Sequence, residues 1–295
     1  MTTNHPDVTL LAHNYVRPEV QDAADFVGDS LELARLASRT ATPYIVVAGV
    51  DFMAETAAIL NPGRTVLHPE PRSSCSMALR LTPADVLAAR AAHPGAPVVA
   101  YVNSSAAVKA VSDICCTSAN AVQVVDALDG DEVIFVPDRN LAAYAAARTE
   151  KTVHAVPATG CCPVHQALGA GDVRAALAAH PGAEVMVHPE CTPAVQAEAD
   201  FIGSTSAMIR HARETPASTV IVGTEIGLVP RLQRESPGKQ FVPASPYLVC
   251  PDMKIITLEL VEDAITARAP VVTVPREVAA RARVALERML ALPAA

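Results

Sequence analysis

An internal repeat constrains this chain more than any other feature of its sequence. Each copy has three markers: an anchor residue, an Asp at the twelfth position after it and a hydroxyl side chain five positions further on. The markers are His13, Asp25 and Ser30 in the first copy, Tyr101, Asp113 and Ser118 in the second, and His188, Asp200 and Thr205 in the third. These anchors are almost evenly spaced, so three copies nearly fill the chain of 295 residues. Such repetition predicts three similar structural units.

Every copy also has the same order of expected elements. An apolar strand (TLLAHN, PVVAYV or EVMVHP) precedes a short helix, an amphipathic helix and a second apolar strand, followed by another helix and a short strand. Apolar strands that alternate with helices are typical of parallel sheets covered on both faces. We therefore expect an α/β fold of three pseudo-threefold-related α/β/α sandwich domains around a central active site. The expected units are 1–80, 81–167 and 168–253, and 254–295 is expected to pack back on the first.

Polar side chains follow the first strand of every copy. They are His13 and Tyr15, Tyr101 and Asn103, and His188 and Glu190. Because ligands bind beyond the carboxyl ends of parallel strands, three units facing one axis would bring these side chains into one pocket.

The repeated hydroxyls are expected at helix starts. Ser30, Ser118 and Thr205 would act there as N-caps, and the same position suits binding of a carboxylate or phosphate by free N–H groups. Lys109 and Arg139 could neutralise an anionic substrate, but we favour solvated helix charges for both.

Three of the seven cysteines occupy the same position of the repeat. Counted from the anchor of its own copy, the offset is 62 for Cys75, 61 for Cys162 and 62 for Cys250. The other four have no matching trio: Cys115, Cys116, Cys161 and Cys191. Three thiolates from three loops suit either a tetrahedral zinc with one open position or a four-iron cluster with one iron unligated by protein. The alternative, small buried hydrophobes, is favoured for a single cysteine but not for three in register.

Charge and composition exclude several other classes. A net charge of −8 and 3% aromatic residues disfavour a nucleic-acid surface, which needs cations and stacking rings. The N-terminus lacks a basic region followed by an apolar stretch, and apolar runs such as YIVVAGV are too short to span a membrane. We expect a cytoplasmic protein without disulfides, in which cysteines bind metal or stay as buried thiols.

Many longer strings resemble the quinolinate synthase (NadA) family. They include LAHNY, DFVGDSLELA, VVAGVDFMAETAAILNP, YVNSSAAVKA, DICCTSANAV, GCCPVH, HPEC, ADFIGSTSAMI and CPDMK, in the family's order and spacing from about Leu10 to beyond Lys254. The resemblance implies a [4Fe-4S] cluster with three Cys ligands and one open iron. Its ligands map onto Cys75, Cys162 and Cys250.

The resemblance also implies an activity. The family, a transferase family, condenses iminoaspartate with dihydroxyacetone phosphate to quinolinate, phosphate and water in de novo NAD biosynthesis. This links it to an aspartate-oxidising enzyme, and the open iron would act as a Lewis acid. Glu190 would be the general acid–base, with Tyr15 and His188 also catalytic. The substrate-binding residues would be His13, Ser30, Tyr101, Asn103, Ser118, His188, Glu190 and Thr205.

The family's G-x-C-x-x-H string helps to identify the second ligand. Gly160 and His165 place Cys162 at its cysteine, so Cys161 occupies the variable position. An alternative role for His165 is to support a cluster ligand by a hydrogen bond rather than to bind substrate.

Two other functions would also explain three cysteines at one repeat position. One is another cluster-dependent dehydratase that acts on a different hydroxy acid, and the other is a non-catalytic iron–sulfur or zinc sensor. A sensor has no need of His, Tyr, Asn, Ser and Glu at equivalent strand ends, so the pocket favours an enzyme.

Overall fold

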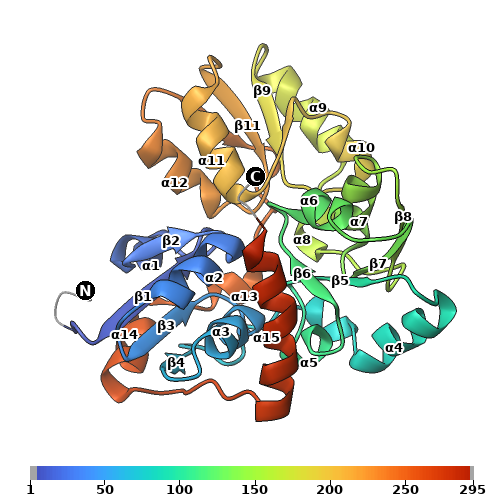
Figure 1. Ribbon diagram of the computed structural model, residues 1–295. Helices are drawn as coiled ribbons and strands as arrows, with labels where there is room; N and C mark the ends of the chain where they lie inside the picture. Colours follow the sequence, from blue (N-terminus) through green and yellow to red (C-terminus); the bar gives the residue numbers. More distant parts are fainter. Residues whose placement is uncertain (1–4, 293–295) are drawn as a thin grey trace.

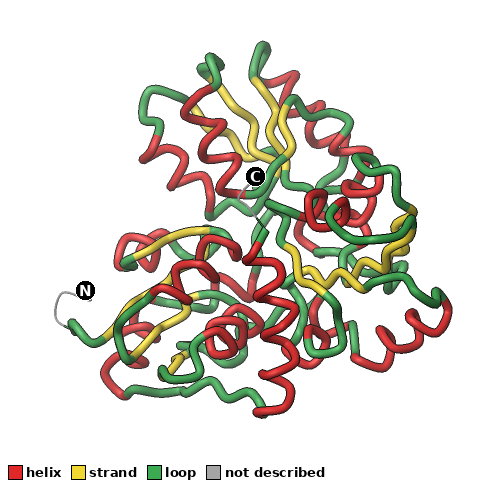
Figure 2. Tube along the Cα trace, viewed as in Figure 1, coloured by secondary structure: helices red, strands yellow, loops and turns green. Residues whose placement is uncertain are grey.

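The computed structural model describes residues 5–292 and has three four-stranded parallel sheets flanked by helices (Figures 1 and 2). The strands are β1 Val8–His13, β2 Phe26–Gly28, β3 Tyr44–Ala48 and β4 Thr65–Leu67; β5 Val98–Tyr101, β6 Ile114–Cys116, β7 Glu132–Val136 and β8 Thr152–Ala155; and β9 Glu184–Val187, β10 Phe201–Ile202, β11 Thr219–Gly223 and β12 Gln240–Pro243. Their orders are β2-β1-β3-β4, β6-β5-β7-β8 and β10-β9-β11-β12. The predicted fold class, three α/β/α sandwiches with parallel sheets, is confirmed.

The Asp repeated in every copy has a structural role. Its carboxylate accepts a hydrogen bond from a backbone N–H of the unit's first strand, and its own N–H donates to the carbonyl of that same strand residue. The carboxylate bonds are Leu10 N to Asp25 Oδ2 (2.7 Å), Val98 N to Asp113 Oδ2 (2.7 Å) and Val185 N to Asp200 Oδ2 (2.8 Å). The repeated Asp therefore provides a hydrogen-bond acceptor for a strand N–H group that would otherwise lack one.

The helices cover both faces of the sheets. They are α1 Pro18–Ala23, α2 Ser30–Arg39, α3 Asp51–Leu60, the 3-10 turn Ala78–Arg80, α4 Pro83–Ala92, α5 Ala106–Lys109, α6 Ala121–Asp126, α7 Arg139–Ala146, α8 Pro163–Gln166, α9 Ala170–Ala179, α10 Pro193–Gln196, α11 Thr205–Glu214, α12 Leu228–Glu235, α13 Pro251–Lys254, α14 Leu258–Ala267 and α15 Arg276–Ala291. Side-chain caps define several starts: Asp29 forms a capping box with Glu32 at α2, and Ser204 caps α11.

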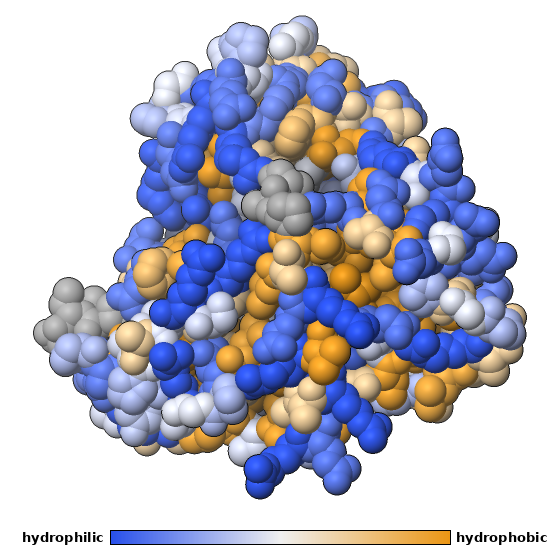
Figure 3. Space-filling model, in the orientation of Figure 1, coloured by the Kyte–Doolittle hydropathy of each residue, from blue (hydrophilic) through white to orange (hydrophobic). Residues whose placement is uncertain are grey.

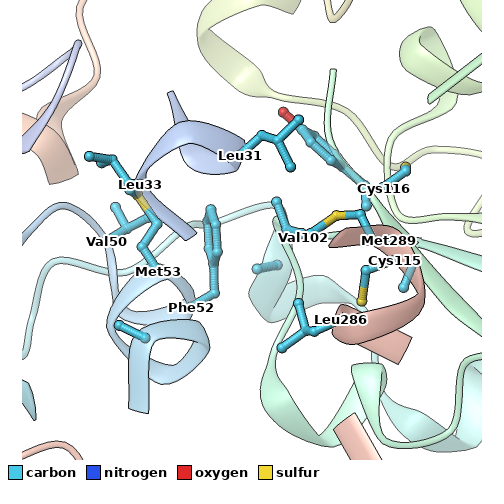
Figure 4. Packing of buried hydrophobic residues seen from close by; sticks show 14 of the residues in the cluster. Leu31, Leu33, Val50, Phe52, Met53, Val102, Cys115, Cys116, Leu286 and Met289 are labelled. Carbon is cyan, nitrogen blue, oxygen red and sulfur yellow. The ribbon is translucent and has the colours of Figure 1, made fainter. Parts of the chain in front are cut away.

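The C-terminal segment contacts two units. Helix α14 packs on α1 and β3 of the first unit, and Val271 forms a bridge with Leu67 at its sheet edge. Helix α15 contacts α3 but also α5 and β6 of the second unit (Figure 1). In Figure 4, Leu286 and Met289 of α15 lie beside Cys115 and Cys116 of β6, in the same buried cluster as Phe52. Both cysteines are fully buried, which matches the role of small core hydrophobes.

The surface is mixed in character. Hydrophilic side chains are spread over the view in Figure 3, and hydrophobic ones gather toward the middle of it. Across residues 5–292, no helix combines the length and the apolar composition that crossing a bilayer requires.

Candidate active site

One cavity of about 230 Å³ is lined by side chains of all three units. Every residue that the repeat placed at a strand end or hydroxyl position lines it: His13, Tyr15, Ser30, Tyr101, Asn103, Ser118, His188, Glu190 and Thr205. So do Cys75, Cys162 and Cys250, whereas Cys115, Cys116, Cys161 and Cys191 do not. The polar residues at the strand ends and the three cysteines at the shared repeat position therefore line one cavity, as the strand-end rule predicts.

The three lining cysteines are half-buried thiols. Burial is the main cause that raises their pKa values, to about 12 for Cys75 and about 11 for Cys250. The pKa of Cys162 is also raised, by burial first and then by the negative charge of Glu190. Backbone N–H groups that follow each cysteine in the chain point at its sulfur and partly oppose this rise. Such thiols stay protonated at neutral pH unless a cation draws the proton off.

An acidic residue just beyond the end of each unit's third strand holds the cysteine loop. Asp138 Oδ2 accepts from Cys162 N at 3.0 Å, and Glu225 Oε1 accepts from Cys250 N at 3.1 Å. In the first unit, Asp51 Oδ2 accepts from the hydroxyl of Ser74, one residue before Cys75, at 2.5 Å. Sequence reasoning missed these residues, although the equal spacing of Asp51, Asp138 and Glu225 along the chain could have revealed them.

The carboxylate of Glu190 is a buried charge in the wall of the cavity. Its Oε2 lies 3.1 Å from His165 Nδ1 and 3.3 Å from His188 Nδ1, while Oε1 is buried without a hydrogen-bond partner. Burial on its own raises the pKa of Glu190, but the hydrogen bonds from the two histidines outweigh it and hold the pKa below its usual value. Glu190 is therefore ionised at neutral pH, with one oxygen free to meet a donor.

A hydrogen-bonded chain connects Glu190 to Tyr15 across the three units. Thr224, which follows β11, has its hydroxyl oxygen 2.6 Å from the Tyr15 hydroxyl and 2.8 Å from His165 Nε2. When His165 donates Nδ1–H toward Glu190, its Nε2 must accept from Thr224, which in turn accepts from Tyr15. The Nδ1 of His165 also lies 3.2 Å from Cys162 Sγ, so one imidazole touches both the acid and a cysteine.

The two anchor histidines are held as neutral donors. His13 Nδ1 accepts from Tyr15 N at 3.2 Å, so its proton lies on Nε2, whereas His188 carries its proton on Nδ1 and donates it to Glu190 Oε2 at 3.3 Å. Burial lowers the pKa of His13 to about 4 and also lowers that of His188, where the charge of Glu190 partly opposes it. The Nε2–H of His13 remains available, and His188 Nε2 accepts from the Ser118 hydroxyl at 3.1 Å.

The expected helix starts are only partly correct. Ser30 and Thr205 are the first residues of α2 and α11, but the caps are Asp29 and Ser204, one position earlier. Ser118 does not begin a helix, because the side chain of Asn120 bonds back to Thr117 and forms a turn, and α6 starts only after Asn120. All three repeated hydroxyls are thus freed from capping and line the cavity.

The prediction of solvated charges at Lys109 and Arg139 is wrong for Lys109. Its side chain is fully buried, its Nζ donates to the carbonyl of Ser104, and burial lowers its pKa. The cause is α15, which covers α5. Arg139 is half-buried and donates to Gln166 Oε1 at 3.2 Å. Neither lines the cavity, and no Lys or Arg between residues 5 and 292 does.

Comparison with known proteins identifies the family of this chain. The family model described as quinolinate synthetase A protein matches residues 2–291. The chain belongs to the quinolinate synthase family. It is 56% identical to the quinolinate synthase of Methanoregula boonei over 283 residues, which cover 96% of this chain and 93% of the relative. It is 52% identical to that of Geobacter metallireducens (97% and 94% covered) and 52% identical to that of Pyrococcus furiosus (95% and 92%). The resemblance seen in the motifs is therefore confirmed.

Proposed function

We propose that this member of the quinolinate synthase family condenses iminoaspartate with dihydroxyacetone phosphate to quinolinate in NAD biosynthesis. Phosphate and two water molecules balance the atoms. The observation that carries the proposal is the shared cavity: cysteines from the equivalent loops of three units line it together with the unpartnered oxygen of Glu190. The names of the relatives support the same reaction.

The cysteine trio fits a [4Fe-4S] cluster with one iron free of protein ligands. The donors are three thiols on one cavity, with pKa values raised by burial and, for Cys75 and Cys162, also by a neighbouring thiol, so they need iron to lose their protons. Three soft sulfur donors exclude magnesium or calcium. When bound, the cluster supplies a Lewis acid that helps a hydroxyl leave as water. Acidic residues behind the loops hold the backbone of the second and third cysteine loops and the Ser74 hydroxyl of the first.

Neutral donors and acceptors, rather than Lys or Arg, would orient the substrates. The Nε2–H of His13 and the hydroxyls of Ser30 and Thr205 suit carboxylate and phosphate oxygens, and the Ser118 oxygen, whose hydrogen goes to His188, can accept from the substrate. Asn103 Oδ1 is a buried acceptor without a partner, so it suits a hydroxyl or imine N–H of the substrate. The hydroxyls of Tyr15 and Tyr101 stay protonated, because burial raises both pKa values.

Glu190 would move the protons of the condensation. It lines the cavity, is ionised in the resting site and has no hydrogen-bond partner at Oε1, so its first step is to accept a proton from a substrate carbon or nitrogen. His165 and His188 hold the carboxylate in place through Oε2 while this proton is taken up and later returned. Tyr15 and His188 belong to the same hydrogen-bonded network and assist it.

The substitution Glu190→Gln tests this assignment. It keeps size and shape but cannot accept a proton, so kcat is expected to fall by at least about 100-fold with full iron content. Glu198→Gln is the matched control, because Glu198 pairs with Arg174 on the surface and does not line the cavity. Wild-type turnover in the Glu190→Gln enzyme would contradict the role. We further propose that the protein works in the cytoplasm beside an aspartate-oxidising enzyme, since iminoaspartate is unstable in water.

A further inference from the structure

Three side chains of the second unit gather their metal-binding atoms at one point. His154 Nε2 lies 2.9 Å from Glu132 Oε2, and His93 Nδ1 lies 4.0 Å from the same oxygen. The two imidazole rings stack with centroids 3.8 Å apart. One ligand atom of each residue lies within 4.8 Å of the others.

The cluster is built on regular elements and is remote from the central cavity. His93 is the C-cap of α4, Glu132 is the first residue of β7 and His154 is the third residue of β8, the edge strand paired with β7. The central cavity lies at the carboxyl ends of the strands, whereas Glu132 is at the amino end of β7, on the opposite side of the sheet. None of the three residues lines the cavity.

The repeat shows that the fold does not require Glu132 or His154. His154 pairs with Ile134, and the equivalent strand positions in the other two sheets hold Leu67 and Val242. The position of Glu132 is taken by Tyr44 and Thr219. An aliphatic side chain therefore satisfies packing at this strand position, and the imidazole is a local addition of the second unit.

We propose that His93, Glu132 and His154 bind a divalent transition metal of the zinc class. Two neutral imidazoles and one carboxylate are a ligand set that zinc favours over magnesium or calcium. Ligand atoms about 2.0–2.1 Å from a tetrahedral zinc are roughly 3.3 Å apart, and the observed 2.9 and 4.0 Å fall on either side of this separation. The separations therefore fit a tetrahedral zinc, whose binding would turn the two imidazoles out of their stacked arrangement.

Exposure allows the metal to enter and leaves room for a water ligand. The side chains of His93, Glu132 and His154 are 32%, 55% and 24% exposed. The bound ion joins the end of α4 to the β7–β8 edge, so it stabilises the folded chain by mass action without acting in the reaction.

Zinc titration of the anaerobically purified, iron-loaded enzyme tests the proposal, by calorimetry and by the shift in Tm. Wild type is expected to bind about one zinc per chain at this site and to gain thermal stability. His154→Val, which installs the residue of the third sheet, and Glu132→Gln should each weaken binding by more than about tenfold and abolish the Tm gain. His180→Val is the matched control, because His180 is the C-cap of α9, the equivalent of His93 in the third unit. This control should bind zinc like wild type.

Two results would overturn the proposal. One is zinc affinity of His154→Val equal to that of wild type, since zinc would then bind elsewhere, for example at cysteines that have lost iron. The other is no saturable binding to wild type up to about 1 mM zinc. If His154→Val unfolds more easily than wild type without zinc, the same comparison is decided by Glu132→Gln, whose carboxylate is partly exposed.

Discussion

Replacing Thr224 with Val should slow the reaction without removing the cluster. The Thr224 hydroxyl is buried at the junction of the three units. It accepts from the Tyr15 hydroxyl at 2.6 Å and donates to His165 Nε2 at 2.8 Å. Valine has nearly the same shape, so packing is kept, but the Tyr15 hydroxyl loses its acceptor and His165 Nε2 loses its donor. Each unsatisfied buried group costs about 1–3 kcal/mol. His165 is then free to turn away from Glu190.

A loss of about 1.4–3 kcal/mol in the active arrangement corresponds to a fall in kcat of roughly 10- to 150-fold. The assay is quinolinate formation by anaerobic enzyme, with kcat and KM determined separately and iron measured on the same sample. Thr224→Ser keeps the hydroxyl and is the matched control, expected within about threefold of wild type.

The reasoning is refuted if Thr224→Val turns over like Thr224→Ser with full iron. It is also refuted if the loss of activity in Thr224→Val only follows a loss of iron, because Thr224 would then hold the fold rather than orient His165.

Three further changes test the site and the fold. Gly160→Ala should lose most of its cluster iron, because a Cβ there overlaps the carbonyl oxygen of Pro137 and displaces the second cysteine loop. Gly171→Ala should keep its iron, because a Cβ there meets nothing within 4 Å. Equal iron content in the two variants would contradict this reasoning. Asp200→Ala should lower the free energy of unfolding in urea by about 1–2 kcal/mol with kcat unchanged, because a β9 amide loses its acceptor; unchanged stability would remove the structural role. The pKa of His13 is lowered from 6.5 to about 4, so the unfolded chain binds more protons as the pH falls through this range. Between pH 7 and 5, wild type should therefore lose about 2 kcal/mol more stability than His13→Gln in urea titrations, and equal losses would contradict the pKa shift.

The repeat made much of the fold and site accessible from sequence. Strand pattern and anchors predict the three parallel sheets and the residues at their carboxyl ends, because both depend on local periodicity and one topological rule. The nearly equal offsets from the anchors single out Cys75, Cys162 and Cys250 among the cysteines of the chain. The acidic residues behind the cysteine loops, such as Asp138, were within reach of the same reasoning but were not recognised.

Other features depend on contacts that no local pattern contains. The burial of Lys109 follows from α15, which comes at the far end of the described chain and covers α5. Thr224 could not be recognised as a link, because its partners Tyr15 and His165 come from the other two units. The turn that delays α6 beyond Ser118 is formed by an Asn side chain that competes with the helix start.

The central claim is that three cysteines hold a cluster that serves quinolinate synthesis. Its most direct test measures iron, sulfide and quinolinate formation from iminoaspartate and dihydroxyacetone phosphate on one anaerobically purified sample. We predict about four irons and four sulfides per chain together with product. A chain that takes up no iron even after anaerobic reconstitution, or a fully loaded chain that forms no quinolinate, would contradict it.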